Sequence, residues 1–196
     1  DSGCICVTDS TFKAEIFNTH NQNLTDDFVT TIYEDKKRNS WILTGKGLTF
    51  LTPNHDQKLF YFHPKSDTPY KNCEPFFDAL EFEDEIWFAS SNGRIWRYDK
   101  DKSVFSVLKT QATSDIITLK KISSEKIFIV PENSGFLIYN TFDRSIDKYD
   151  TQTLPEMKSN KILNTFIDKS KNIWMETDQL GVAKFNPYTK KYIHFT

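Results

Sequence analysis

The stretch YEDKKRNSWILTGKGLTFL, Tyr33 to Leu51, combines a charged turn, a tryptophan, a threonine and a glycine with runs of alternating apolar residues. Apolar alternation with a period of two is typical of β-strands, and charged residues between two such runs indicate a turn. The stretch therefore predicts strands joined by short turns. Whether the fold is built from repeats depends on whether this stretch recurs along the chain.

The tryptophan of this stretch recurs along the chain. Trp41 has counterparts at Trp87, Phe128 and Trp174, separated by 46, 41 and 46 residues. A glycine follows each of them six or seven residues later, at Gly47, Gly93, Gly135 and Gly181, and Gly3 opens a similar strand, GCICVTD. Self-similarity at a fixed period indicates a repeat architecture.

The first and last copies are the most alike, as VTTIYEDKKRNSWILTGKGLTFL and ILNTFIDKSKNIWMETDQLGVAKF show. The coinciding positions are Val29/Ile162, Asp35/Asp168, Asn39/Asn172, Trp41/Trp174 and Thr44/Thr177. The two middle copies are looser, and one of them has Phe128 in place of the tryptophan.

Each copy predicts four short strands, because alternating apolar runs are separated by Asp, Asn, Lys and Gly turns. In the first full copy the strands are expected near 28–34, 40–44, 48–52 and 58–63. No segment carries a helical apolar stripe over three turns. A repeat of this length with four strands is typical of a β-propeller blade, whose two faces are buried only when other blades flank it. The chain is therefore predicted to be all-β.

The expected blades fill one propeller segment, 1–196. They are a half blade at 1–17 and complete four-stranded antiparallel blades at 22–64, 70–109, 113–150 and 158–196. Seven blades would need roughly 300 residues or more, so we expect a segment of a larger propeller of the seven-bladed type.

The start, DSGCICV, has no signal-peptide pattern and indicates a mature or excised segment. Open blade faces and strand edges at its ends predict self-association.

The stretch VTTIYEDKKRNSWILTGKGL resembles the repeat of two-component regulator propellers, in which an apolar strand, Asp, a polar Gly-Asn turn, Trp, Thr and Gly-Leu follow in order. The match is strong at 28–52 and 162–186 and looser at 76–99 and 116–140, and Arg38 stands where the family usually has Gly. The resemblance implies the periplasmic sensor region of an inner-membrane hybrid two-component protein, with a histidine kinase and response regulator in the rest of the parent. It also implies detection of a glycan-derived signal.

The repeated residues have structural roles that need no ligand. The tryptophans and Phe128 are expected to pack between neighbouring blades. Asp35 and Asp168 precede a hairpin turn and are expected to accept hydrogen bonds from its amides. The glycines open third strands, where a positive φ or a close backbone approach would require them.

Composition excludes several classes of function. Lys and Arg number 25 and Asp and Glu 27, without long runs of one sign, so we expect no nucleic-acid partner.

Cys4 and Cys6 are too close in sequence to form a disulfide with each other. Cys73 is isolated, which leaves a bridge to either of them or three buried or half-buried thiols as alternatives.

No catalytic, metal or cofactor site is expected. The four histidines are scattered, without a helical pair or zinc-ligand spacing: His20, His55, His63 and His194. Glu83 and Asp84 stand in a turn, without the apolar surroundings that raise a carboxyl pKa for acid catalysis.

The stretch GRIWRYD supplies the candidate ligand site. Strand alternation places Arg94, Trp96 and Tyr98 on one face and Ile95 and Arg97 on the other. An aromatic ring flanked by guanidinium groups suits stacking on a sugar and pairing with a uronate or sulfate. The alternative is that Trp96 packs on the next blade while the arginines reach solvent.

Three classes of function remain. The first is a non-enzymatic sensor segment that binds an oligosaccharide. The second is a carbohydrate-active propeller enzyme, a lyase or hydrolase, and the third is a protein-interaction propeller, because fold alone does not fix function.

Overall fold

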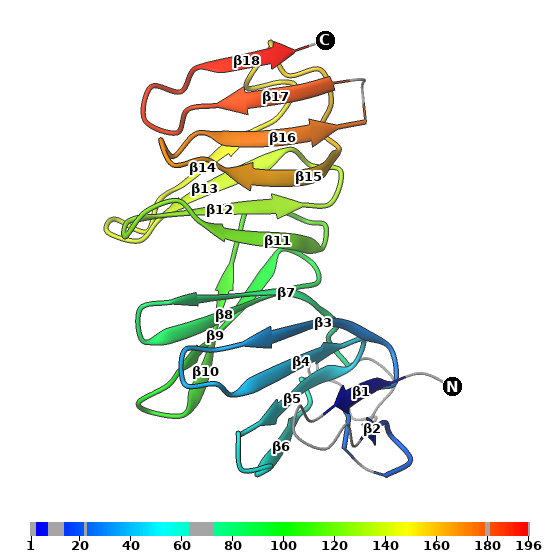
Figure 1. Ribbon diagram of the computed structural model, residues 1–196. Helices are drawn as coiled ribbons and strands as arrows, with labels where there is room; N and C mark the ends of the chain where they lie inside the picture. The colour runs from blue at the N-terminus through cyan, green and yellow to red at the C-terminus, as the bar shows by residue number, and fades with distance from the viewer. Residues whose placement is uncertain (1–2, 8–13, 22, 63–72, 179–180, 196) are drawn as a thin grey trace. The chain divides into compact units, whose positions relative to one another are not determined.

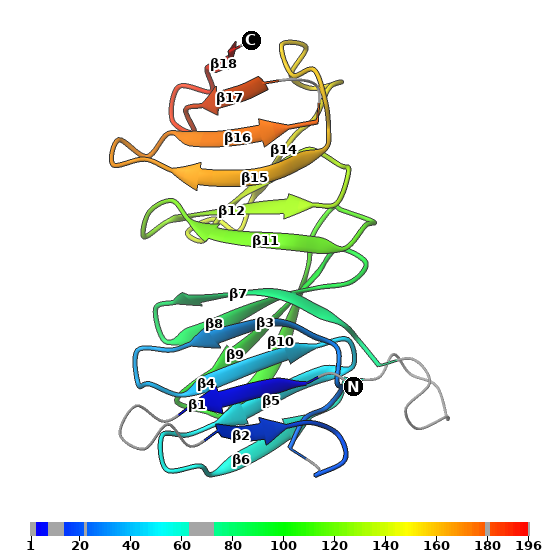
Figure 2. The same ribbon diagram turned by 45° about the vertical axis from the view of Figure 1, so that its right-hand side comes forward.

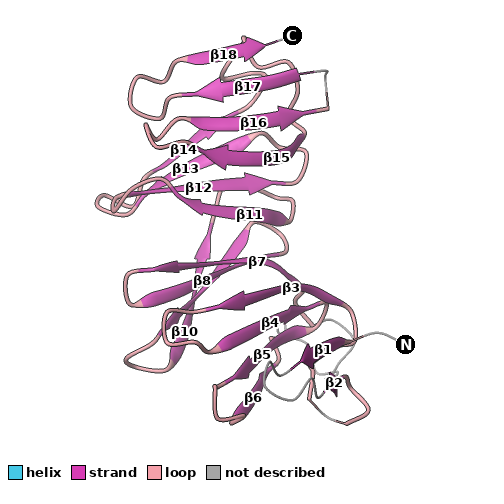
Figure 3. Ribbon diagram, in the orientation of Figure 1, coloured by secondary structure: helices cyan, strands magenta, loops and turns pink. Residues whose placement is uncertain are grey.

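The computed structural model describes residues 3–7, 14–21, 23–62, 73–178 and 181–195 of the 196-residue chain. Every regular element within these residues is a β-strand, as Figure 3 shows. The predicted all-β fold class is confirmed.

Four sheets contain four strands each, and the strands of a sheet follow one another along the chain (Figure 1). The strands are β3 (Val29–Glu34), β4 (Ser40–Thr44), β5 (Gly47–Leu51) and β6 (Gln57–Phe60); β7 (Phe76–Phe82), β8 (Glu85–Ser90), β9 (Arg94–Asp99) and β10 (Val104–Lys109); β11 (Ile116–Lys121), β12 (Lys126–Pro131), β13 (Phe136–Asn140) and β14 (Ile146–Tyr149); β15 (Ile162–Ile167), β16 (Ile173–Thr177), β17 (Gly181–Phe185) and β18 (Tyr192–Phe195). A two-stranded sheet pairs β1 (Cys4–Val7) with β2 (Ala14–Phe17) in antiparallel register. The predicted series of four-stranded sheets is therefore observed.

The chain divides into two compact units, residues 1–81 (unit 1) and 82–196 (unit 2). Unit 1 contains β1 to β6 and β7 up to Glu81, and unit 2 contains β8 to β18.

The first strands β3, β11 and β15 share an irregularity that the sequence did not predict. Each shifts register by one residue against its neighbour near its start, between Val29 and Thr31, Ile116 and Thr118, and Ile162 and Asn164. A β-bulge of this kind turns the following side chains to the other face. It explains why the apolar alternation of these strands is weak.

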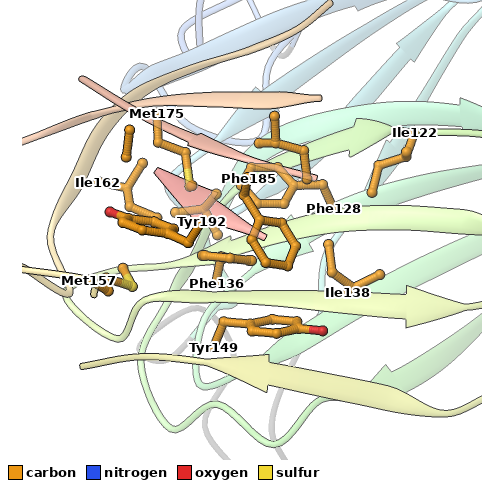
Figure 4. Packing of buried hydrophobic residues seen from close by; sticks show 13 residues of the cluster. Ile122, Phe128, Phe136, Ile138, Tyr149, Met157, Ile162, Met175, Phe185 and Tyr192 are labelled. Atoms are coloured by element: carbon orange, nitrogen blue, oxygen red, sulfur yellow. The ribbon is translucent and has the colours of Figure 1, made fainter. Parts of the chain in front are cut away.

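A hydrophobic core in unit 2 joins the sheets β11–β14 and β15–β18 (Figure 4). Phe136 lies at its centre, with its ring centroid 4.9 Å from that of Tyr149 and 5.0 Å from that of Phe185. Met175 reaches the same core from β16. Each such buried side chain stabilises the packing by about 1.5–3 kcal/mol.

A second core lies in unit 1, where Phe17 and Leu24 pack against Ile42 of β4 (Figure 2 shows β2 beside this sheet). Cys4 contacts this core, and burial, followed by the nearby Cys6, raises the pKa of its thiol. Only the Cys4 end of β1 reaches the core, so Cys6 is exposed and the predicted set of three buried or half-buried thiols is wrong for Cys6. Neither residue forms a disulfide.

The Asp of the repeat organises the first hairpin turn of its sheet. Oδ1 of Asp35 accepts hydrogen bonds from the backbone N–H groups of Lys37 and Asn39, both at 2.9 Å. Its Oδ2 accepts one from the indole Nε1 of Trp41 at 3.3 Å. The predicted turn role of Asp35 is confirmed.

The last sheet repeats this turn. Asp168 accepts hydrogen bonds from the backbone N–H of Asn172 at 2.9 Å and from Nε1 of Trp174 at 3.0 Å. Arg38 and Lys171 precede the Asn in the two turns, with φ of 64° and 65°. These left-handed values explain why the family whose repeat this stretch resembles favours Gly there.

The glycines that open third strands are required by their surroundings. Gly47 has φ 154°, and a Cβ on it would lie 2.2 Å from the carbonyl oxygen of Phe60. Gly135 has φ 74° and would place a Cβ 2.1 Å from the carbonyl oxygen of Tyr149. Positive φ and close backbone approach, as predicted, act together.

The repeated aromatic residues lie on second strands, and three of the four are buried. Trp41, Trp87 and Phe128 are 1%, 2% and 0% exposed. Trp174 is only half-buried, so its predicted burial between blades is wrong. Its face of β16 is covered within the described residues only by its own sheet, where Phe195 stacks on the ring at 5.6 Å.

Candidate functional site

A cavity of about 420 Å³ in unit 2 is lined by charged hairpin turns. Its lining has five acidic residues (Glu83, Asp84, Glu85, Asp99, Asp101), three basic residues (Arg97, Lys102, Arg144), and Phe82, Trp87, Tyr139 and Thr141. The mixture of carboxylates, guanidinium groups and aromatic rings makes it the candidate ligand site.

The turns converge because of strand order. Residues 83–84 join β7 to β8, and residues 100–103 join β9 to β10. The first and third turns of an antiparallel four-stranded sheet leave the same edge. The β13–β14 turn of the next sheet contributes Arg144 to the same cavity. Hairpin turns of two sheets thus surround one hollow.

The floor of the cavity is formed by a cross-strand pair on β8 and β9. Trp87 pairs with Arg97, and the Arg97 Cζ lies 5.5 Å from the centroid of the Trp87 ring. Oε2 of Glu85 accepts a hydrogen bond from the Trp87 indole at 2.8 Å and lies 4.0 Å from Nη1 of Arg97. Because the Trp87 ring is buried beneath Arg97 and Glu85, a ligand would contact the Arg97 guanidinium and the Glu85 carboxylate instead of the indole face.

Aromatic neighbours hold Trp87 in place from two sides. The ring of Tyr139 on β13 lies 5.5 Å away at 60°, and the ring of Phe82 lies 5.9 Å away at 57°. Lys121 covers Phe82, with its Nζ 4.8 Å from the ring centroid. Tilted aromatic pairs of this kind add about 0.5–1.5 kcal/mol each beyond burial. The Trp87 ring is therefore packed against aromatic rings on two sides.

One carboxylate on the rim of the cavity, that of Asp99, is held in place by hydrogen bonds. Asp99 accepts a hydrogen bond from Nζ of Lys102 at 2.8 Å and from the backbone N–H groups of Asp101 and Lys102 at 3.0 and 2.9 Å. The Lys102 ammonium, followed by the Lys102 backbone N–H, lowers the pKa of Asp99. Asp99 is therefore ionised at neutral pH.

The remaining rim groups can bind a ligand directly. Within the described part of the chain, no hydrogen bond or ion pair engages the side chains of Glu83, Asp84, Asp101 or Arg144. Carboxylates accept and guanidinium groups donate, so together they match vicinal hydroxyl groups. Five carboxylates against three cations disfavour an acidic ligand.

The pKa of Asp99 bears on the chemistry that this carboxyl could perform. A catalytic acid needs a raised carboxyl pKa, whereas that of Asp99 is lowered. Asp99 is therefore suited to accept hydrogen bonds and not to act as a general acid at neutral pH.

The sequence-predicted site residues Arg94, Trp96 and Tyr98 lie on β9, on the face opposite to Arg97. All three are half-buried, and Nη2 of Arg94 donates a hydrogen bond to Oγ of Ser91 at 3.2 Å. None of them lines the cavity. A ligand role for these three residues stays a separate prediction.

Sequence reasoning missed Arg97 and Glu85. The stretch GRIWRYD contained a signal, because it placed Arg97 on the other face of the same strand. Its pairing with Trp87 depends on strand register between β8 and β9, which a single sequence does not specify. The contribution of Arg144 depends in addition on the packing of a second sheet.

Among the described residues, no group of three His, Cys, Asp or Glu side chains is close enough to hold a metal ion. His63 lies outside the described residues. None of the described segments forms an apolar helix of the length that a bilayer crossing needs.

Comparison with known proteins gives matches in structure. No protein-family model matches the chain, and no curated protein matches it. The extracellular domain of BT4673 from B. thetaiotaomicron, described as a hybrid two-component system, matches with a TM-score of 0.74 at 14% identity, covering 100% of this chain and 33% of that chain. A second structure of this domain, described as a one-component system, matches with a TM-score of 0.74 at 15% identity, covering 98% and 32%.

A streptogramin B lyase structure also matches, with a TM-score of 0.70 at 12% identity, covering 95% of this chain and 59% of that chain. At such identities the matches establish the fold: the four sheets and the two-stranded sheet form a β-propeller segment, as predicted. The chain spans about one third of the length of the BT4673 domain. The lyase match shows that the fold alone does not separate a sensor from an enzyme.

Proposed function

We propose that this chain belongs to the periplasmic sensor region of a hybrid two-component protein and binds a glycan-derived ligand without chemistry of its own. The observation that carries the proposal is the match of the whole chain to the extracellular domain of BT4673. The Asp-Asn-Trp turn of the repeat supports it, because the same turn geometry recurs at Asp35 and Asp168. The kinase and response regulator belong to the remainder of the parent protein.

The cavity around Arg97 and Glu85 is the proposed ligand site. Its donors and acceptors suit a hydroxyl-rich molecule, and its excess of carboxylates favours a neutral oligosaccharide over a uronate-containing or sulfated one.

Calorimetric titration with neutral and acidic oligosaccharides tests this proposal. We expect saturable binding of a neutral oligosaccharide and at least about tenfold weaker binding by Arg97→Ala, since a charge-assisted hydrogen bond contributes about 1.5–3 kcal/mol. Lys169→Ala changes an exposed turn residue far from the cavity in sequence and should bind like the parent chain. Equal binding by Arg97→Ala and Lys169→Ala would contradict the assignment of the cavity.

The lyase match favours an enzyme as the second candidate. Chromatography of the same oligosaccharides after prolonged incubation distinguishes the two functions. Binding without new products supports the sensor, whereas product formation abolished by changes in the cavity supports the enzyme.

A further inference from the structure

Two turns of unit 2, between β13 and β14 and between β17 and β18, have the same backbone geometry. In each turn, the side chain of an Asn accepts a hydrogen bond at 3.0 Å from the backbone N–H of an aromatic residue two positions later. These aromatic residues are Phe142 and Tyr188. Two positions after them, Arg144 and Lys190 have left-handed φ values of 61° and 57°. Phe142 therefore corresponds to Tyr188, and Arg144 corresponds to Lys190.

The β17–β18 turn contacts the preceding sheet, β11–β14, through both of these side chains. Nζ of Lys126, the first residue of β12, lies 5.1 Å from the centroid of the Tyr188 ring. Nζ of Lys190 lies 3.2 Å from Oδ2 of Asp147 on β14. Between these two sheets, the aromatic ring and the cation of the turn thus bind side chains of the protein itself.

The β13–β14 turn borders the sheet β7–β10 at the cavity, and there the two partner positions carry different residues. Glu85 stands at the position of Lys126, since each begins the second strand of its sheet two residues before the repeated aromatic residue. Ser106 stands at the position of Asp147, since each pairs with the residue that lies opposite that aromatic residue. The ammonium group is thus replaced by a carboxylate, and the carboxylate is replaced by a hydroxyl group.

Phe142 and Arg144 consequently lack the contacts that their counterparts make. Phe142 is 88% exposed, compared with 54% for Tyr188, although its turn has the same hydrogen bond. Arg144 lines the cavity of about 420 Å³, and Glu85 lines it from the opposite sheet. The cavity therefore opens where, between the next two sheets, the Lys126 side chain lies.

We propose that Phe142 is a further ligand-contacting residue of this cavity, and that its ring stacks on the apolar C–H face of a sugar. The inference rests on the proposed function of the cavity as the oligosaccharide site. Ligand pockets combine aromatic surface with a few polar groups, but the aromatic rings that line this cavity, those of Phe82, Trp87 and Tyr139, are buried. Phe142 supplies the missing aromatic surface, and Arg144 donates hydrogen bonds to the hydroxyl groups of the same sugar.

Calorimetric titration with neutral hexasaccharides of β-linked glucose, xylose and mannose tests the proposal. For the hexasaccharide that the unchanged chain binds best, we expect about fivefold weaker binding by Phe142→Ala, the size of one aromatic contact. Thermal denaturation should not change, because the Phe142 ring is exposed. Tyr188→Ala is the matched control, because it removes the corresponding ring of the next turn, and it should bind like the unchanged chain.

Two further variants test whether stacking is the cause. Phe142→Trp should restore the affinity, whereas Phe142→Leu, which is apolar but has no ring, should not. Equal affinity of Phe142→Ala and Tyr188→Ala, with saturable binding intact, would overturn the inference and leave the proposed function standing. Absence of binding of all three hexasaccharides by the unchanged chain would overturn both.

Discussion

The sheets β3–β6 and β15–β18 share the same turn but differ in what covers their tryptophan. In both sheets an Asp accepts the indole hydrogen bond, and the residue before the Asn has a left-handed backbone. Trp41 is nevertheless 1% exposed, whereas Trp174 is half-buried. The turn is thus determined by residues within one hairpin, and burial is determined by neighbouring sheets.

The paired threonines show the same contrast. Oγ1 of Thr44 shares a hydrogen bond with Oγ1 of Thr25 at 2.7 Å. Oγ1 of Thr177, its counterpart in the last sheet, is buried and has no hydrogen-bond partner among the described residues. Equal residues in equal register therefore meet different surroundings.

The largest expected effect comes from removing the two tryptophans. Trp41→Ala should reduce the local unfolding free energy by about 3–5 kcal/mol, because it empties a buried aromatic site. Trp174→Ala should cost less, since its ring is only partly buried and less apolar area is lost from the interior. Native-state hydrogen exchange at β4 and β16, measured at low protein concentration, gives the two values. Equal losses would show that something covers Trp174 in solution.

A smaller effect is expected at a position where the two sheets carry different residues. Tyr192 on β18 is buried, whereas Gln57 in the same register of β6 is exposed. Within the part of the chain that the structure describes, Oη of Tyr192 has no hydrogen-bond partner, and burial raises its pKa to about 12. Tyr192→Phe should therefore stabilise unit 2 by about 1 kcal/mol at neutral pH.

The same variant should change the response to alkaline pH. The pKa of Tyr192 in the folded state lies above the unfolded value of about 10. The contribution of its neutral side chain to the free energy of unfolding is therefore complete below pH 10. This contribution is lost as pH rises toward 12, by roughly 2–3 kcal/mol. Tyr192→Phe should flatten this loss in denaturant titrations. For the stabilisation at neutral pH, Tyr149→Phe is the control, because Oη of Tyr149 donates to Asp147 at 3.4 Å and its removal should not stabilise.

The turn itself can be tested through Asp168. The Asn172 side chain, followed by the Trp174 indole, lowers the pKa of Asp168 to about 2. Asn172→Ala should raise this pKa toward its ordinary value, and Trp174→Phe should raise it less. The stability that Asp168 contributes is present above pH 4 and is lost as pH falls toward 2. Carboxyl-carbon NMR titration measures the shifts, and an unchanged pKa in Asn172→Ala would contradict the assigned hydrogen bonds.

The smallest expected effect concerns the left-handed residues of the two turns. Arg38→Gly and Lys171→Gly should each stabilise by about 0.5–1 kcal/mol, because a non-glycine residue at this φ is strained. Nε of Arg38 also lies 3.2 Å from Oε1 of Glu34, but exposed ion pairs contribute little to stability. The two gains should therefore be nearly equal in thermal denaturation. Destabilisation by either change would mean that the side chain contributes more than its backbone strain costs.

The sequence predicted what depends on local pattern. The period of Trp41, the turn role of Asp35 and the need for Gly47 all follow from residues close together in the chain. The partial exposure of Trp174 does not, because it depends on packing between sheets. The bulges near Val29 and Ile162 depend on the register between neighbouring strands, which a single sequence does not specify.

The candidate site was less accessible to prediction for the same reason. Arg94, Trp96 and Tyr98 were selected by composition, and the structure places Arg97, from the opposite face of that strand, in the cavity. Its partners Glu85 and Trp87 come from the neighbouring strand, and Arg144 comes from another sheet. Strand register and sheet packing, which a single sequence does not reveal, determine this convergence.

The Asp-Asn-Trp turn also bears on the order in which the chain folds. The hydrogen bonds that the Asp35 and Asp168 carboxylates accept within the turn come from residues at most six positions away, as from Trp41 to Asp35 and from Trp174 to Asp168. Closing a loop this short takes about 10–100 ns and forming a hairpin about 1–10 μs, well before distant sheets meet. We expect both turns to act as early nuclei with equal rates, whether or not a neighbour later covers the ring. Repetition of the turn would then give the chain several independent starting points for folding.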